Sequence, residues 1–218
     1  MSFDFAIIWQ SLPRLMSGLA WTIGMSIAAG AIAFALGLTI ALLYGLRSRL
    51  LRLLLRLYID FMRGIPILVV LFLLYYAGPS FGLRLDATAV GLIGLGCYGA
   101  AYFAEVFRSG LEHIPVGEIE AARMLGLSRM QIAWRIELPQ MFAIVTPSLI
   151  NQMIMLIKES AVLSVITVPE LTTMTTKVVN ETFRVTEPFL TMAVLYWFLI
   201  ESLSRIGQFI ERRLRRYI

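Results

Sequence analysis

Long apolar segments separated by short polar ones dominate this chain of 218 residues. A membrane-spanning helix needs about 20 predominantly apolar residues, and several of these segments reach that length. We expect spans at about residues 19–46, 57–77, 87–107, 141–167 and 188–207. The pattern predicts an all-α integral membrane protein of five transmembrane helices, with a single domain over residues 1–218.

Residues 1–18 precede the first expected span. They lack the basic start and the small-residue cleavage site of a removable signal peptide. Their apolar residues instead predict a short interfacial helix. Within the first span, small residues recur every four positions, which predicts a close packing seam against another helix, because small side chains let membrane helices approach. The recurring residues are Ala29, Ala33, Gly37, Ala41 and Gly45.

The second segment is irregular. Arg56, Asp60 and Arg63 share one helical face, and Gly64 and Pro66 then interrupt the helix. The apolar run after them, residues 67–77, is too short to span alone. We therefore expect a bent element with a basic foot at the cytoplasmic surface. Such interrupted helices often border substrate pathways, and a charged interfacial anchor is the alternative.

Composition and charge support the membrane assignment. Hydrophobic residues make up 59% of the chain and charged residues only 15%, with a mean hydropathy of +0.80. The isoelectric point near 9.7 does not indicate nucleic-acid binding, because the basic residues cluster at the ends of apolar runs. Thirteen arginines fall on one side of the expected topology and four basic residues on the other. By the positive-inside rule, the N-terminus lies outside and the C-terminus in the cytoplasm.

The polar stretch between the third and fourth spans, residues 112–139, predicts a helix, a tight turn and a second helix. Pro115 suits a first helical turn, and Gly126 suits the left-handed position that ends a helix. Ser128 followed by Gln131 forms a capping-box pattern, and Pro139 is expected to interrupt the second helix. On the first helix, Ala121, Ala122 and Leu125 share a face small enough for another protein to approach.

This stretch carries the pattern E-A-A-x3-G-x9-I-x-L-P, and three further blocks occur in residues 63–68, 104–110 and 158–166. The pattern resembles the signature of permease subunits of bacterial ATP-binding-cassette (ABC) importers of type I, and the blocks resemble the polar amino-acid uptake branch. The resemblance covers about residues 19–213. The ATPase-coupling positions that it implies are Glu120, Ala121, Ala122, Gly126, Leu127, Ile136, Leu138 and Pro139.

The resemblance implies an architecture and a set of partners. The cytoplasmic loop is expected to form the coupling helix that docks on a separate ATPase. Two ATPase subunits, a second permease chain and a periplasmic or extracellular binding protein are expected around it, with a polar amino acid as substrate in the bacterial cell (inner) membrane. ATP and Mg would bind to the partner subunits, and this chain would hold no cofactor. An amphipathic surface hairpin without a partner is the alternative.

A charged pair near the end of the fourth span is the candidate for the substrate path. A charge at membrane depth is costly and normally faces a partner or a wet cavity. Lys158 and Glu159, with Ser160, could meet the carboxylate and amino groups of a zwitterion, and Asn151 extends a polar stripe on the Lys158 face. Alternatively, the pair lies at the outer interface, where Lys158 snorkels and Glu159 caps the next segment.

Two other classes of function compete with the importer. A membrane-embedded enzyme would need converging nucleophiles, acids or metal ligands, and the chain has only one histidine, His113, and one cysteine, Cys97. An energy-independent channel would need rings of charge or a carbonyl filter. Co-purification with an ATPase would favour the importer, and flux without ATP would favour the channel.

Overall fold

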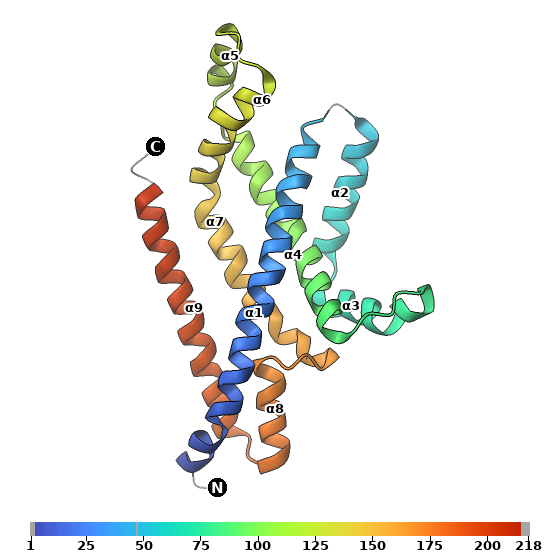
Figure 1. Cartoon of the computed structure of the whole chain (residues 1–218), viewed down its shortest axis with the longest axis vertical. Coiled ribbons are helices and arrows are strands. Elements are labelled where there is room, and N and C mark those ends of the chain that lie inside the picture. The colour runs from blue at the N-terminus through green and yellow to red at the C-terminus, as the bar shows by residue number, and fades with distance from the viewer. Residues whose placement is uncertain (1–2, 47, 215–218) are drawn as a thin grey trace.

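The computed structural model describes residues 3–46 and 48–214, and within these ranges every regular element is helical (Figure 1). The α-helices are α1 (Phe5–Tyr44), α2 (Arg49–Gly64), α3 (Ile67–Phe72), α4 (Ala87–Glu112), α5 (Val116–Met124), α6 (Arg129–Ile132), α7 (Leu138–Glu159), α8 (Leu171–Thr182) and α9 (Thr186–Leu214). Two π-helical segments, η1 (Leu73–Ala77) and η3 (Ala133–Glu137), and two 3-10 segments, η2 (Gly78–Phe81) and η4 (Ser160–Ile166), complete the fold.

The long helices α1, α4, α7 and α9 run along the length of the molecule (Figure 1). Helices α5 and α6 lie at one end, and α8 lies near the opposite end with the start of α1. Four helical stretches are long and apolar enough to cross a membrane, and α2 with the segment from α3 to η2 forms a fifth, broken candidate. The predicted all-α membrane architecture is therefore confirmed.

Helix α1 is longer than expected. It is continuous over 40 residues from Phe5 to Tyr44, and Pro13 lies inside it. The prediction of a short interfacial helix before the span is therefore wrong, because residues 5–18 form the first turns of the same helix that continues through the span. The Asp4 side chain caps this helix by accepting a hydrogen bond from the backbone N–H of Ala6 at 2.9 Å.

The small-residue stripe of α1 forms the predicted packing seam, and its partner is α4; the last predicted member, Gly45, lies beyond the end of α1 and is exposed. Ala29, Ala33 and Gly37 are buried, and no other pair of helices has a more extensive contact than α1 with α4. A Cβ atom built on Gly37 would come within 2.6 Å of the Cβ atom of Phe103. Glycine at this position thus sets how closely the two helices approach.

The second span is bent, as predicted. The axes of α2 and the segment from α3 to η2 differ by 105°. Ile65 has the extended conformation that a following proline favours, and Pro66 is the N-cap residue of α3. Tyr58 of α2 donates a hydrogen bond to the carbonyl oxygen of Cys97 and so ties α2 to α4. The basic half of the segment thereby becomes a separate helix beside α4.

The polar stretch between the fourth and fifth expected spans, residues 169–187, contains a helix. Helix α8 occupies most of this range, and the carboxylate of Glu170 caps it by accepting hydrogen bonds from the backbone N–H groups of Thr172 (2.8 Å) and Thr173 (2.7 Å). Leu171 and Val178 pack with Leu15 of α1 in a small second core. Threonine has a low helix propensity, so these tertiary contacts stabilise the helix.

Candidate coupling loop and substrate path

The loop that carries the sequence signature is a helix–turn–helix, as predicted. Helix α5 ends in a Schellman motif, in which Leu127 N–H donates to the Ala122 carbonyl (3.2 Å) and Gly126 N–H donates to the Arg123 carbonyl (2.9 Å). Gly126 has a φ of +77°, the left-handed conformation that glycine adopts without steric cost. The turn between α5 and α6 is therefore fixed by local chemistry.

The second helix begins with the predicted capping box. The Ser128 hydroxyl accepts a hydrogen bond from the Gln131 N–H (3.3 Å), and the Gln131 side chain accepts one from the Ser128 N–H (2.8 Å). The expectation that Pro139 interrupts this helix is wrong. Helix α6 passes through the π-helical segment η3 into α7, and Pro139 occupies the first turn of α7. The widened π turn precedes the proline, so the chain stays helical.

The tip of the loop exposes large apolar side chains. Met124 and Leu125 are 90% and 81% exposed, and Met130 and Trp134 are also exposed. Glu120, Ala121, Gly126 and Pro139 are exposed as well, whereas Leu127 and Ile136 are partly buried. An exposed apolar cluster of this kind is typical of an interaction surface.

Two of the predicted coupling positions face the interior of the chain. Ala122 is only 2% exposed, and Leu138 is also buried. The interpretation of Ala122 as part of a surface for another protein is therefore wrong, because its face of α5 packs inward while Ala121 and Leu125 face outward. Ala122 instead contributes the carbonyl that closes the Schellman motif.

The charged pair lies where α7 ends and η4 begins, a junction near α3 and away from both ends of the molecule (Figure 1). Asn151 and Lys158 are exposed, Glu159 is partly buried and Ser160 is buried. The Ser160 hydroxyl donates to the Ile157 carbonyl at 2.7 Å, so it is satisfied within its own helix. The Glu159 side chain makes no capping hydrogen bond to η4, which removes one part of the interfacial alternative.

A cavity of about 370 Å³ lies between α2, α4 and α7, on the α5–α6 side of this junction. Arg63, Tyr102, Glu105 and Gln152 are among the residues that line it. The Gln152 Oε1 atom is buried and has no hydrogen-bond partner. A buried acceptor without a partner is costly, so a polar occupant of the cavity would be stabilised there.

An ion-pair network borders this cavity. Arg63 lies 3.4 Å from Glu105, and Arg108 lies 2.9 Å from the same carboxylate. The Arg63 guanidinium also lies over the Tyr102 ring, 5.5 Å from its centroid. The hydroxyls of Tyr102 and Tyr98 are 3.1 Å apart.

Polar groups thus form a line from Tyr98 through Tyr102 to Arg63 and Glu105. The sequence analysis did not identify the tyrosines. Tyr98, Tyr102 and Glu105 recur at i, i+4 and i+7 on α4, and that spacing was the available signal.

Glu170 is a second residue that the sequence analysis missed. Its side chain is fully buried. Burial raises the pKa of this carboxyl, and the hydrogen bonds from Thr172 and Thr173 oppose the rise. Tyr196 of α9 donates to Glu170 at 3.3 Å, and the Leu171 N–H donates to the Thr22 hydroxyl of α1 at 3.1 Å. This cluster joins α8 to both neighbouring helices, which is a structural role.

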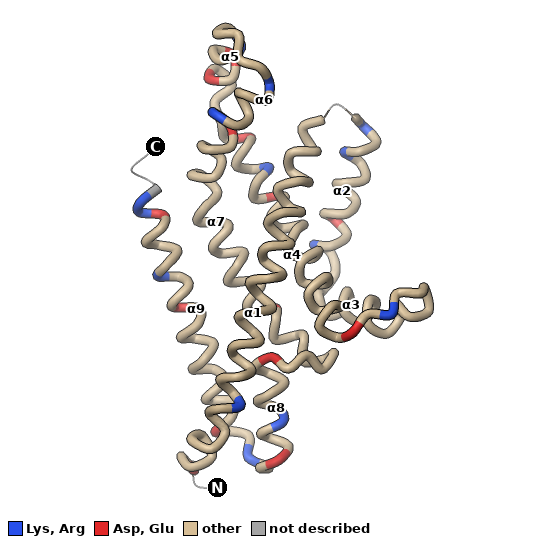
Figure 2. Tube along the Cα trace, viewed as in Figure 1, with Lys and Arg blue, Asp and Glu red and all other residues tan. Residues whose placement is uncertain are grey.

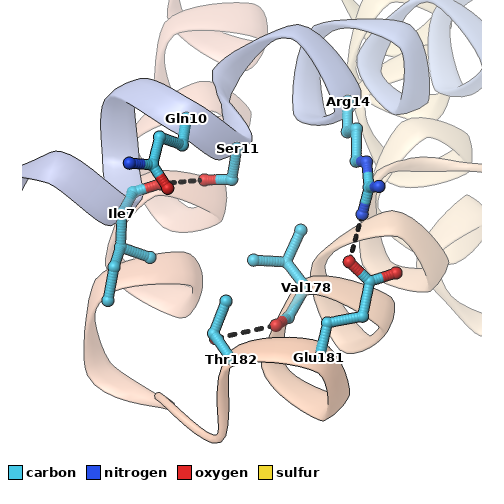
Figure 3. Close-up of a pocket in the computed structure, with 7 residues that line it drawn as sticks. All are labelled: Ile7, Gln10, Ser11, Arg14, Val178, Glu181 and Thr182. Carbon is cyan, nitrogen blue, oxygen red and sulfur yellow. Dashed lines mark hydrogen bonds and ion pairs between the residues drawn. The ribbon is translucent and has the colours of Figure 1, made fainter.

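A further cavity of about 240 Å³ separates the start of α1 from α8 (Figure 3). Arg14 and Glu181 form an ion pair across its rim. The Ser11 hydroxyl donates to the Ile7 carbonyl at 2.7 Å, and the Thr182 hydroxyl donates to Val178 within α8 at 2.8 Å. Because these polar groups already have partners, the cavity resembles a surface groove more than a binding site.

Comparison with known proteins assigns the chain to a family. A model described as binding-protein-dependent transport system inner membrane component matches residues 34–216. The chain belongs to this family. It is similar to the probable amino-acid ABC transporter permease protein YckA of Bacillus subtilis (strain 168), with 34% identity over 216 residues, covering 99% of this chain and 96% of that protein.

Solved structures agree with the family assignment. A crystal structure of an amino acid ABC transporter with histidines has a TM-score of 0.91 and 32% identity, and the match covers 98% of this chain and all of that one. An inward-facing structure of the MetNI methionine ABC transporter has a TM-score of 0.81 over 97% of this chain at 22% identity, which indicates the fold alone. The chain is therefore a multi-pass membrane subunit of a transport system, and the alternative of a membrane-embedded enzyme is not supported.

Proposed function

We propose that this chain is the membrane subunit of an ATP-driven importer for a polar amino acid, coupled to separate ATPase subunits through the loop of α5 and α6. The observation that carries the coupling role is the rigid helix–turn–helix with an exposed apolar tip at one end of the molecule. Two ATPases, a second permease chain and an external binding protein complete the assembly, and ATP and Mg bind to the ATPases. The amino-acid substrate class follows from the names of the relatives.

The distribution of charge supports the orientation that this proposal needs. Lys and Arg residues gather in α2, in α5 and α6 and at the end of α9, all toward the same end of the molecule (Figure 2). Arg47, Arg215 and Arg216, which were counted on this side, lie outside the described residues. By the positive-inside rule, this distribution supports a cytoplasmic location for the α5–α6 end and the end of α9, where ATP is available, and an external location for the start of α1.

A substrate path follows from the polar groups along α4 and α7. Lys158, Glu159 and Asn151 receive the zwitterion, and the cavity beside Gln152 and Arg63 lies farther toward the cytoplasmic end. A cation and an anion side by side complement the carboxylate and ammonium groups of an amino acid. A second copy of the chain, or a close relative, closes the open side of this path.

The coupling role is tested by two glycine substitutions in one loop. Gly126→Val forces a β-branched residue into a left-handed conformation, which costs roughly 1 kcal/mol or more. Gly117→Val is the control, because Gly117 has ordinary helical geometry and open space around its Cα. We expect Gly126→Val to insert in the membrane but to lose co-purification with the ATPase or substrate-stimulated hydrolysis. Normal coupling in Gly126→Val would show that this loop is not the coupling element.

Orientation is tested by thiol labelling in a Cys97→Ala background. A cysteine at Asn180, in α8, should react with an impermeant reagent added to intact cells, and a cysteine at Met130, in α6, should react only after permeabilisation. Both native side chains are exposed, so access depends on the side of the membrane. The reverse labelling would contradict the importer topology.

The substrate path is tested with Lys158→Met and Glu159→Gln in assembled complexes. Lys177→Met is a matched control, because Lys177 is an exposed lysine on α8, away from the proposed path. We expect a higher apparent KM for uptake, or weaker coupling of substrate to hydrolysis, in the first two variants only. Unchanged affinity and coupling in both would remove the pair from the path.

A further inference from the structure

The arginines in the first half of α2 are not used by the proposed transport mechanism. Arg49, Arg52 and Arg56 lie within one narrow sector of this helix, at i, i+3 and i+7. With Tyr44 of α1 and Leu53 they line a crevice of about 370 Å³ between the ends of α1 and α2. Three guanidinium groups therefore converge on one concave site.

This crevice lacks a counter-charge. Among the described residues, no carboxylate lies within ion-pair distance of Arg49, Arg52 or Arg56, whereas Arg63 and Arg108 share Glu105. A neighbouring cavity of about 230 Å³ that Arg56 also lines contains Asp60 and Glu105, so these two carboxylates line the next cavity and not the crevice. The electrostatic field in the crevice favours an anion with several acceptor oxygens.

The adjoining face of α2 is apolar and exposed. Three leucines on this face are exposed, and each comes one or two positions after an arginine in the sequence: Leu50 (67%), Leu54 (55%) and Leu57 (56%). Arg56 lies seven residues beyond Arg49, about 10 Å along the helix axis. The interfacial layer of each leaflet is roughly 5–8 Å thick. Arg56 thus approaches the hydrocarbon boundary, where an unpaired charge is costly.

We propose that the crevice between α1 and α2 binds the headgroup of an anionic phospholipid. The arginines bind the phosphate oxygens, and the acyl chains lie along the leucines of α2. The exposed leucines place the crevice beside lipid, so a phospholipid can present its phosphate to the arginines while its own acyl chains cover the leucines. The inference rests on the membrane setting of the chain and is independent of the proposed coupling to an ATPase.

The experiment is a lipid titration of the purified full-length chain, with the subunits that co-purify, followed by native mass spectrometry. Phosphatidylglycerol is compared with phosphatidylcholine of the same acyl chains, and glycerol phosphate represents the free headgroup. The test variant is Arg52→Gln/Arg56→Gln. The control is Arg212→Gln/Arg213→Gln, which removes the same charge from the exposed end of α9 (Figure 2).

We expect phosphatidylglycerol to bind roughly tenfold or more weakly to the crevice variant and nearly unchanged to the control, since each arginine near an anionic surface contributes measurably to lipid affinity. Arg52→Lys/Arg56→Lys should retain part of the binding. Equal losses in both glutamine variants would indicate general surface attraction and overturn the proposal. Glycerol phosphate binding as tightly as the lipid would assign the crevice to a soluble anion. A crevice variant that keeps its lipid but loses the second permease chain would assign it to the dimer.

Discussion

Two glycines of α1 offer a matched test of the packing between α1 and α4. A Cβ atom at Gly37 would lie 2.6 Å from the Phe103 Cβ, 3.0 Å from the Ala104 backbone nitrogen and 3.1 Å from the Ala100 carbonyl oxygen. A Cβ atom at Gly24, on the same helix, would meet nothing within 4 Å. Gly37→Ala and Gly24→Ala therefore add the same methyl group to two different environments.

The expected difference follows from these distances. Ordinary contact begins at 3.4 Å, so Gly37→Ala must separate the helices by about 0.8 Å (3.4 minus 2.6), and two of the three opposing atoms belong to the backbone. Overpacking of this kind costs about 1–3 kcal/mol. Both variants gain the same helix propensity, about 1 kcal/mol, and this term cancels in the comparison. Gly37→Ala should thus be less stable than Gly24→Ala by about 1–3 kcal/mol.

The assay is thermal unfolding in one detergent, followed by the fraction of protein that remains monodisperse on size exclusion after heating. For a chain of this length we expect the midpoint of Gly37→Ala to lie roughly 2–12 °C below that of Gly24→Ala. Equal midpoints, or a more stable Gly37→Ala, would refute the reasoning that the small residues of α1 set its approach to α4.

Three further predictions concern charged groups. Burial raises the folded-state pKa of Glu170, so the folded protein binds more protons than the unfolded chain at pH values between the ordinary and the raised pKa. Stability should therefore fall as pH rises through that window. Thermal midpoints of Glu170→Gln, measured across the same pH range, should not show this fall. Glu105→Gln should lower the free energy of unfolding by about 3 kcal/mol or less, since it leaves Arg63 facing a neutral partner in a partly exposed site. The charge-conserving Glu105→Asp should recover part of the lost stability. Arg14→Gln should change the midpoint by less than the equivalent of about 1 kcal/mol, because its pair with Glu181 is exposed; a larger loss would show that the rim of this groove is structurally important.

The sequence by itself determined the features that depend on near neighbours in the chain. Runs of apolar residues set the spans, because the bilayer imposes a minimum length on each helix. Gly126 and the capping box of Ser128 and Gln131 set the turn of the loop, because each hydrogen bond there joins residues within six positions of one another. The bend at Pro66 has the same local origin.

Only the tertiary structure decided which side chains of different elements meet. Ala121 and Ala122 are adjacent in sequence, yet packing against the rest of the chain buries one and leaves the other exposed. The contact of Arg63 with Tyr102 and Glu105 joins two helices across about 40 positions, and no local pattern specifies it. The threonine-rich segment after Glu170 is helical because Leu15 and Tyr196 hold it in place, and these contacts exist only once α1 and α9 have packed.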